Sequence, residues 1–140
     1  MKAILSSILI AISISIINAQ PDTSSRSISI QMEIIGIEEV SGKLGIQLYD
    51  KEQNLVSRKW VPVTATEMTA DFTGIQPGTY AIQFYHDAND DGEMNFHWYG
   101  APKEGYGNSN DVKGFFGPPE FSEQLVDFSN SADITMKLIK

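Results

Sequence analysis

From residue 28 onward, hydrophobic and polar residues alternate in short runs, a pattern typical of β-strands with one buried face. No segment carries a sustained helical spacing. The recurrence of such runs at roughly ten-residue intervals predicts an all-β fold, an antiparallel β-sandwich of seven to eight strands as in immunoglobulin-like domains. The predicted strands are 28–34, 44–48, 55–63, 64–72, 80–85, 123–128 and 132–139.

The alternation stops between Phe96 and Phe121. This stretch contains five glycines, three prolines and several aromatic residues, and it predicts one long Gly/Pro-rich loop within a single domain over 27–140. Loops of this length in compact domains are uncommon and usually functional. The bond between Pro118 and Pro119 is a candidate cis peptide.

The beginning of the chain is typical of a secretory signal peptide. Lys2 precedes an apolar run that ends at Asn18-Ala19, so cleavage after Ala19 is predicted, with 1–19 as the signal peptide and 20–26 as a disordered leader. The alternative is an uncleaved anchor, but the run is short for a membrane span. With no cysteine for a lipid anchor or disulfides, we expect a secreted or periplasmic domain without membrane insertion after cleavage.

The chain is acidic, with 18 acidic and 10 basic residues and a formal net charge of −8. Cleavage would remove Lys2, so nine bases would face 18 acids and the charge would become −9. Negative charge repels nucleic acid and anionic membranes, and we expect neither as a partner.

An acidic segment after residue 86 has the spacing of a calcium-binding loop. Its candidate ligands occupy loop positions 1, 3, 5, 7 and 9, with Glu93 contributing its carbonyl: Asp87, Asn89, Asp91, Glu93 and Asn95. The twelfth position is Trp98, so a bidentate glutamate is missing and Glu104, Asp111 or water would complete the site. The alternative is a solvated hairpin, because Asp91-Gly92 is also a strong turn signal.

The aromatic residues of the long loop suggest a pocket for a sugar or an apolar ligand. The candidate ligand-binding residues are Tyr99, Glu104, Tyr106 and Phe116. The alternative is that these rings only fix the loop against the end of the sandwich.

A hydrolytic site is a further alternative. His86 and Ser109 could form a hydrolase pair, but neighbouring residues on a strand point to opposite faces, so His86 and Asp87 should diverge. His86 continues an inward-facing row, and we predict a buried, hydrogen-bonded imidazole. No nucleophile elbow, zinc motif or phosphate loop is present, and no catalytic residue is assigned.

Several short motifs resemble the DUF2141 family, uncharacterised exported bacterial proteins. They are Pro77-Gly-Thr-Tyr-Ala81, His86-Asp87-x-Asn89-x-Asp91-Gly92, Gly100-x-Pro102-x-Glu104-Gly-Tyr-Gly107, Ser109-Asn110 and Phe116-Gly-Pro-Pro119-x-Phe121. The resemblance implies export and a transthyretin-like or prealbumin-like β-sandwich. The chain departs from the family at Asn95, where aspartate is usual, and near Asn108, where an aromatic is usual.

Together these features predict an exported, non-enzymatic β-sandwich module. Calcium would order the long loop and shape a surface for an envelope protein or a glycan. The alternatives are a transthyretin-like carrier of a small molecule and a hydrolase that uses His86.

Overall fold

The computed structural model describes residues 26–140, so the predicted signal peptide and all but the last residue of the predicted leader lie outside the described part. The described chain forms eight strands and one short 3-10 helix, η1. Their bounds are β1 Ile28–Ile35, β2 Lys43–Asp50, β3 Leu55–Pro62, β4 Met68–Ile75, β5 Gly78–Asp87, β6 Tyr106–Asn108, η1 Phe121–Gln124, β7 Leu125–Phe128 and β8 Ala132–Lys137. The predicted all-β fold is confirmed. Within residues 26–140, no helix is long and apolar enough to span a bilayer.

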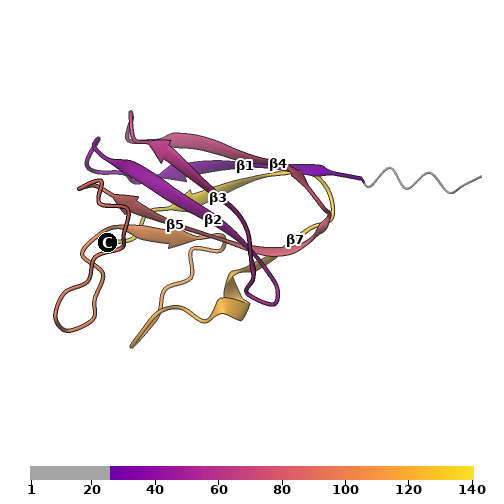
Figure 1. The fold of residues 1–140 in the computed structure, drawn as a ribbon. Coiled ribbons are helices and arrows are strands. Elements are labelled where there is room, and N and C mark those ends of the chain that lie inside the picture. Colours follow the sequence, from indigo (N-terminus) through magenta and orange to yellow (C-terminus); the bar gives the residue numbers. More distant parts are fainter. Residues whose placement is uncertain (1–25) are drawn as a thin grey trace, which may run out of the picture.

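The strands form two sheets that pack face to face as a sandwich (Figure 1). One sheet has the order β4-β1-β8, and the other has the order β3-β2-β5-β6, with β7 also paired to β5. The pairing is antiparallel with one exception, because β8 runs parallel to β1. The fully antiparallel arrangement expected from the sequence therefore fails at this one pair.

The apolar positions of the alternating pattern lie in the core, and the polar positions lie on the surface. In β1 every second residue, including Ile28, Ile30 and Met32, is buried, while the residues between them are exposed. They pack against Leu44, Ile46 and further apolar residues of the opposite sheet in one hydrophobic cluster. Burial of this apolar surface is the main source of stability for the two layers.

The predicted long loop is interrupted by β6, which pairs with β5. Three residues are too few to show a period of two, so only the tertiary pairing reveals this strand. The predicted strand over 64–72 begins and ends later, as β4. All peptide bonds of residues 26–140 are trans, so the expected cis bond at Pro118–Pro119 is wrong.

Candidate functional site

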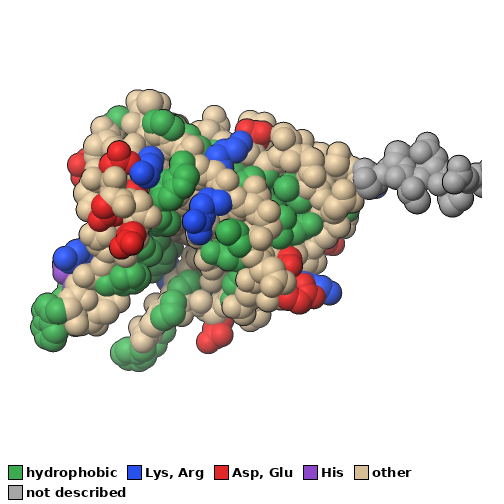
Figure 2. All heavy atoms as spheres, viewed as in Figure 1, with side chains coloured by type: hydrophobic (Ala, Val, Ile, Leu, Met, Phe, Trp, Pro, Cys, Tyr) green, Lys and Arg blue, Asp and Glu red, His purple; other side chains and the backbone are tan. Residues whose placement is uncertain are grey.

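Two arms project from the same side of the sandwich on either side of β6 (Figure 1). The first arm, 88–105, follows β5, and the second arm, 109–120, precedes η1. In the first arm the chain folds back on itself, with a bridge between Phe96 and Pro102 and a hydrogen bond of 2.8 Å from the His97 N–H to the Ala101 carbonyl. Figure 2 shows hydrophobic side chains at the ends of both arms and a hollow between them.

This hollow is a groove with a volume of about 780 Å³, within the usual range of ligand sites. Aromatic, amide, glycine and proline residues line it together with one methionine and one alanine: Gln47, Gln83, Phe84, Tyr85, Met94, Phe96, Tyr99, Gly100, Ala101, Pro102, Tyr106, Gly107, Asn108, Phe115, Phe116, Gly117, Pro118, Pro119 and Gln124. None of these residues is Asp, Glu, Lys, Arg or His. The groove is thus uncharged on a chain with a net charge of −8.

Amide side chains from three strands meet at the floor of the groove. Gln83 of β5 is paired with Gln47 of β2 on one side and with Asn108 of β6 on the other. Paired residues of an antiparallel sheet point to the same face, so the three amides form a row across the sheet. Glutamine and asparagine offer both hydrogen-bond donors and acceptors. The floor is therefore polar but uncharged, and Gln83 Oε1, which has no donor among residues 26–140, can accept from a hydroxyl group.

A hydrogen-bond chain fixes the second arm above this floor. Gln83 Nε2 donates to Gln124 Oε1 at 2.8 Å, and Gln124 Nε2 donates to the Pro119 carbonyl at 3.2 Å. Asn108 Nδ2 donates to the Val112 carbonyl at 2.8 Å, which holds the other side of the same arm. The arm is therefore positioned by side chains of the sheet itself.

Three of the four predicted ligand-binding residues line the groove, namely Tyr99, Tyr106 and Phe116. Glu104 does not line it, because its carboxylate accepts a hydrogen bond from the Asn95 N–H at 3.1 Å in the acidic turn. The floor glutamines were missed by the sequence analysis. They occupy ordinary solvent-facing positions of strands, and only the strand register brings them together.

The acidic turn, 87–95, begins with a carboxylate that is fully buried. Asp87 Oδ1 accepts a hydrogen bond from the Asp91 N–H at 3.0 Å, and its Oδ2 accepts one from the Gly92 N–H at 2.7 Å. The Tyr85 hydroxyl donates to the Gly92 carbonyl at 3.1 Å. Since Tyr85 also lines the groove, the turn and the groove share one side chain.

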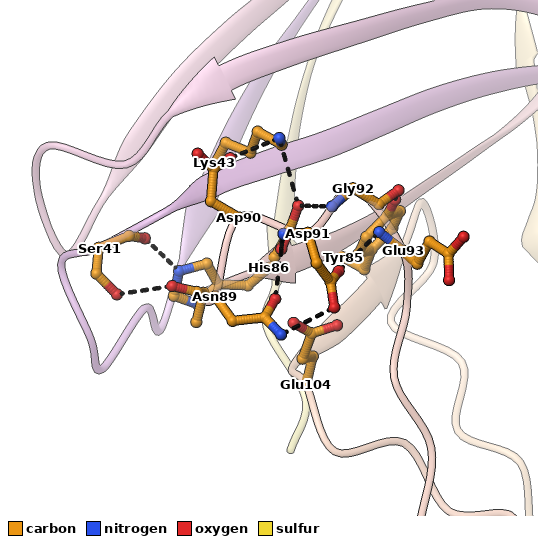
Figure 3. A network of polar contacts seen from close by, with 12 residues as sticks. Ser41, Lys43, Tyr85, His86, Asn89, Asp90, Asp91, Gly92, Glu93 and Glu104 are labelled. Carbon is orange, nitrogen blue, oxygen red and sulfur yellow. Dashed lines mark hydrogen bonds and ion pairs between the residues drawn. The ribbon is translucent and has the colours of Figure 1, made fainter.

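The cation that lies in this turn is a lysine from a neighbouring strand (Figure 3). Lys43 Nζ lies 2.5 Å from Asp90 Oδ1 and 3.5 Å from Asp87 Oδ2. Both contacts favour the protonated ammonium, and the hydrogen bond with Asp90 is the largest cause of the raised pKa of Lys43. The ammonium also lies 4.7 Å from the centre of the Trp60 ring. Lys43 thus offsets part of the repulsion among the clustered acids.

The remaining predicted calcium ligands form hydrogen bonds with one another. Asp91 Oδ2 accepts from the side-chain amides of Asn89 and Asn95, each at 2.9 Å. Asp91 Oδ1 accepts from the Glu93 N–H at 2.9 Å, and the Glu104 carboxylate accepts from the Asn95 N–H at 3.1 Å. Within residues 26–140, no group of three or more His, Cys, Asp or Glu side chains is placed to hold a metal ion.

The pKa of Asp91 is lowered, mainly by the side-chain hydrogen bond from Asn95 and then by those from the Glu93 N–H and Asn89. Because the folded pKa lies below the unfolded one, the contribution to stability is present above the unfolded pKa and is lost as the pH falls through the folded pKa. We therefore expect Asn95→Ala to raise the pKa of Asp91 toward its ordinary value, as measured by NMR titration of the side-chain carboxyl carbon.

The matched control for this titration is Asn54→Ala. Asn54 lowers the pKa of Asp50 in another turn in the same way, so this variant should raise the pKa of Asp50 and leave that of Asp91 unchanged. An unchanged Asp91 pKa in Asn95→Ala would contradict the hydrogen bonding described for the turn.

The side chains considered for hydrolysis are held apart in separate hydrogen bonds. His86 is buried as predicted, and its Nε2 donates to the Ser41 carbonyl at 2.7 Å. Ser109 is also buried, where its hydroxyl donates to the Gln124 carbonyl and accepts from the Ile82 N–H. Among residues 26–140 no hydrogen bond joins His86 to Ser109.

The fold and the groove together define a β-sandwich domain with a loop-formed groove at one side. Residues 32–136 match the model of a family described as "Uncharacterized protein conserved in bacteria (DUF2141)". Because the match covers more than half of the chain, the chain belongs to the DUF2141 family. No curated protein matches the chain.

Proposed function

We propose that this chain is an exported, non-enzymatic β-sandwich module that binds a neutral glycan in the groove between its two arms. The observation that carries the proposal is the absence of any charged residue from the groove lining, on a chain with a net charge of −8. An uncharged site favours an uncharged ligand, because an ionic ligand would lose hydration without gaining a partner.

The residue types of the groove suit a sugar in particular. Aromatic rings offer flat apolar faces to the C–H groups of a pyranose, and Tyr99 and Tyr106 supply such faces. Among the floor amides, Asn108 is already bonded to Val112 and to the Asn110 N–H, and Gln83 Nε2 already donates to Gln124. Gln83 Oε1 accepts no hydrogen bond from residues 26–140, so it has capacity for a ligand.

We expect Tyr106→Ala to weaken the binding of neutral oligosaccharides by at least about tenfold, since truncation of a central aromatic residue removes a main contact. The test is calorimetry with the best binder from a panel of neutral and charged oligosaccharides. The matched control is Tyr49→Ala, a tyrosine on the same sheet that contacts Phe121 and does not line the groove.

In addition, the affinity for a neutral glycan should not change between low and high salt, because screening acts only on charges. A preference for acidic oligosaccharides, or equal weakening by Tyr106→Ala and Tyr49→Ala, would reject the proposal. Binding of an apolar peptide from an envelope protein instead of any glycan would also reject it.

The carrier function would use the same groove. The buried residues between the sheets form one packed cluster, so the open groove and not the sandwich interior is the place for a small ligand. The non-enzymatic character is supported by the buried positions of His86 and Ser109, since neither lines the groove. Hydrolysis of a bound glycan by the purified protein would overturn it.

We also propose that calcium binds weakly to the acidic turn and stabilises the first arm. The supporting observation is that Asn95 binds two carboxylates, that of Asp91 through its side-chain amide at 2.9 Å and that of Glu104 through its N–H at 3.1 Å, while Asn89 also donates to Asp91. Rotation of the Asn89 and Asn95 amides would turn their Oδ1 atoms toward an ion, and calcium prefers such oxygen ligands. Lys43 already partly neutralises Asp87 and Asp90, so a site in the millimolar range is expected.

The expected result is a rise of a few degrees in the thermal midpoint on addition of millimolar calcium, relative to chelator. Asp91→Ala should abolish this rise, whereas Asp71→Ala, an acid paired with Lys59 elsewhere, should retain it. An unchanged thermal midpoint in the unmodified protein would reject the proposal that calcium binds the acidic turn. An equal rise of the thermal midpoint with magnesium would show that divalent ions act by general charge screening and not at a calcium site.

A further inference from the structure

The most exposed of the large apolar side chains of residues 26–140 lie at the ends of the two arms. Trp98 is 95% exposed, Phe115 is 91% exposed and Phe116 is 97% exposed. Leaving three such rings in water forgoes the free energy that their burial would release. Exposed apolar groups that gather in one place mark a surface that contacts a partner.

Both ends are closed turns of the backbone. In the first arm the bridge between Phe96 and Pro102 closes the turn. In the second arm the chain reverses so tightly that a Cβ on Gly114 would lie 1.7 Å from the Gly117 carbonyl oxygen. The two ends project from the same side of the sandwich (Figures 1 and 2). The rings of the two ends are therefore presented on one side of the domain.

The charge of the two ends differs in sign from that of the chain. We define the first tip as residues 96–103 and the second tip as residues 112–119. Each tip contains one lysine, Lys103 or Lys113, and neither contains an aspartate or a glutamate. The remainder of the chain therefore carries all of the 18 acidic residues. A surface with phosphate groups around an apolar layer complements two basic aromatic tips on an acidic body.

We propose that the two tips dock on the surface of a lipid bilayer, where their rings enter the interfacial layer between the headgroups and the hydrocarbon. Tryptophan concentrates at this layer, and shallow insertion of aromatic side chains with neighbouring lysines is a common mode of peripheral binding. The tips share residues with the groove, among them Phe115 and Phe116, whereas Trp98 does not line it, and this proposal does not depend on the one for a glycan. It departs from the expectation that the acidic chain avoids membranes, because no acidic residue lies within either tip. It is also compatible with the absence of a spanning helix in 26–140.

The second tip distinguishes a bilayer from a sugar as the partner. Phe115 and Phe116 carry no polar group, and their neighbours in the turn are Gly114, Gly117 and Lys113. Sugar hydroxyls need amide or carboxylate partners, which this turn does not supply. The boundary of the hydrocarbon layer in a bilayer needs no such polar partners.

The experiment is co-sedimentation of the mature protein with vesicles of phosphatidylcholine, with and without phosphatidylglycerol. We expect binding to the phosphatidylcholine vesicles that persists in high salt, because burial of the rings supplies most of the affinity. Phosphatidylglycerol should not strengthen it, because the net charge of the chain is negative. Trp98→Ser and Phe115→Ser should each reduce the partition coefficient by about tenfold. Leu55→Ser is the matched control, because Leu55 is an exposed apolar residue of β3, and it should bind as the unmodified protein does.

A second readout follows Trp98 itself. The chain has two tryptophans, so Trp60→Phe leaves Trp98 as the single emitter. With vesicles its emission should move to shorter wavelength and should be quenched by brominated lipid. Absence of sedimentation with both vesicles would overturn the proposal, as would binding that the tip variants leave unchanged. Gln47→Ala changes the groove floor only, so loss of glycan binding in this variant with unchanged vesicle binding would separate the two sites.

Discussion

Gly42→Ala is expected to destabilise the domain by about 4 kcal/mol or more, an unusually large effect for a single added methyl group. Gly42 ends the turn before β2 with φ +64, and a Cβ at this position would lie 2.0 Å from the Asp87 carbonyl oxygen. The Gly42 carbonyl also accepts the Val63 N–H at 3.1 Å. The added atom would therefore separate the start of β2 from the end of β5, where the acidic turn begins. The measurement is denaturant unfolding followed by circular dichroism.

The matched control is Gly74→Ala. Gly74 has a similar φ of +70, but no atom lies within 4 Å of a Cβ added there. Gly74→Ala should therefore lower the free energy of unfolding only by the strain of a left-handed residue, about 1–2 kcal/mol. Equal losses in the two variants would show that the close approach of Gly42 to Asp87 is not a constraint on the fold.

Asp87→Ala is expected to destabilise the domain by about 2–4 kcal/mol and to disorder the acidic turn. The change removes the buried acceptor for the Asp91 and Gly92 N–H groups and one of the two acidic partners of Lys43. Unfolding in denaturant measures the stability. Hydrogen exchange at the Asp91 and Gly92 amides measures the local effect, which we expect as faster exchange.

Asp90→Ala is the control for this prediction. Asp90 is exposed and holds Lys43 in a surface ion pair, and such pairs contribute about 0–1 kcal/mol. It should leave the exchange of the Gly92 amide almost unchanged. If Asp90→Ala destabilised the domain as much as Asp87→Ala, the turn would depend on its overall charge and not on the buried acceptor.

The sandwich could be predicted because burial on one face imposes a period of two on the chain. The runs around Ile30 in β1 and Ile46 in β2 carry this period without interruption, and both became strands of opposite sheets. No pattern in the sequence indicates that β8 pairs in parallel with β1. Which strands become neighbours depends on the packing of the whole chain, and the alternation of side chains is the same in either direction.

The candidate site could be predicted only in part. Aromatic residues in an irregular segment indicated Tyr99, Tyr106 and Phe116, which do line the groove. The floor residue Gln83 was not indicated, because a glutamine on a strand is ordinary for a solvent-facing position. Sequence spacing also suggested an ion as the counter-charge of the acidic turn, whereas Lys43 supplies positive charge from a strand more than 40 residues away.

The proposal that a neutral glycan occupies the groove is tested most directly by NMR. Backbone amide shifts of the labelled protein would be followed during titration with the best-binding neutral oligosaccharide. We predict saturable shifts at Gln83, Tyr106 and Gly107 and none along β4, which lies in the other sheet. Shifts that map to the β4-β1-β8 sheet, or no saturable shift with any neutral oligosaccharide of the panel, would contradict the account.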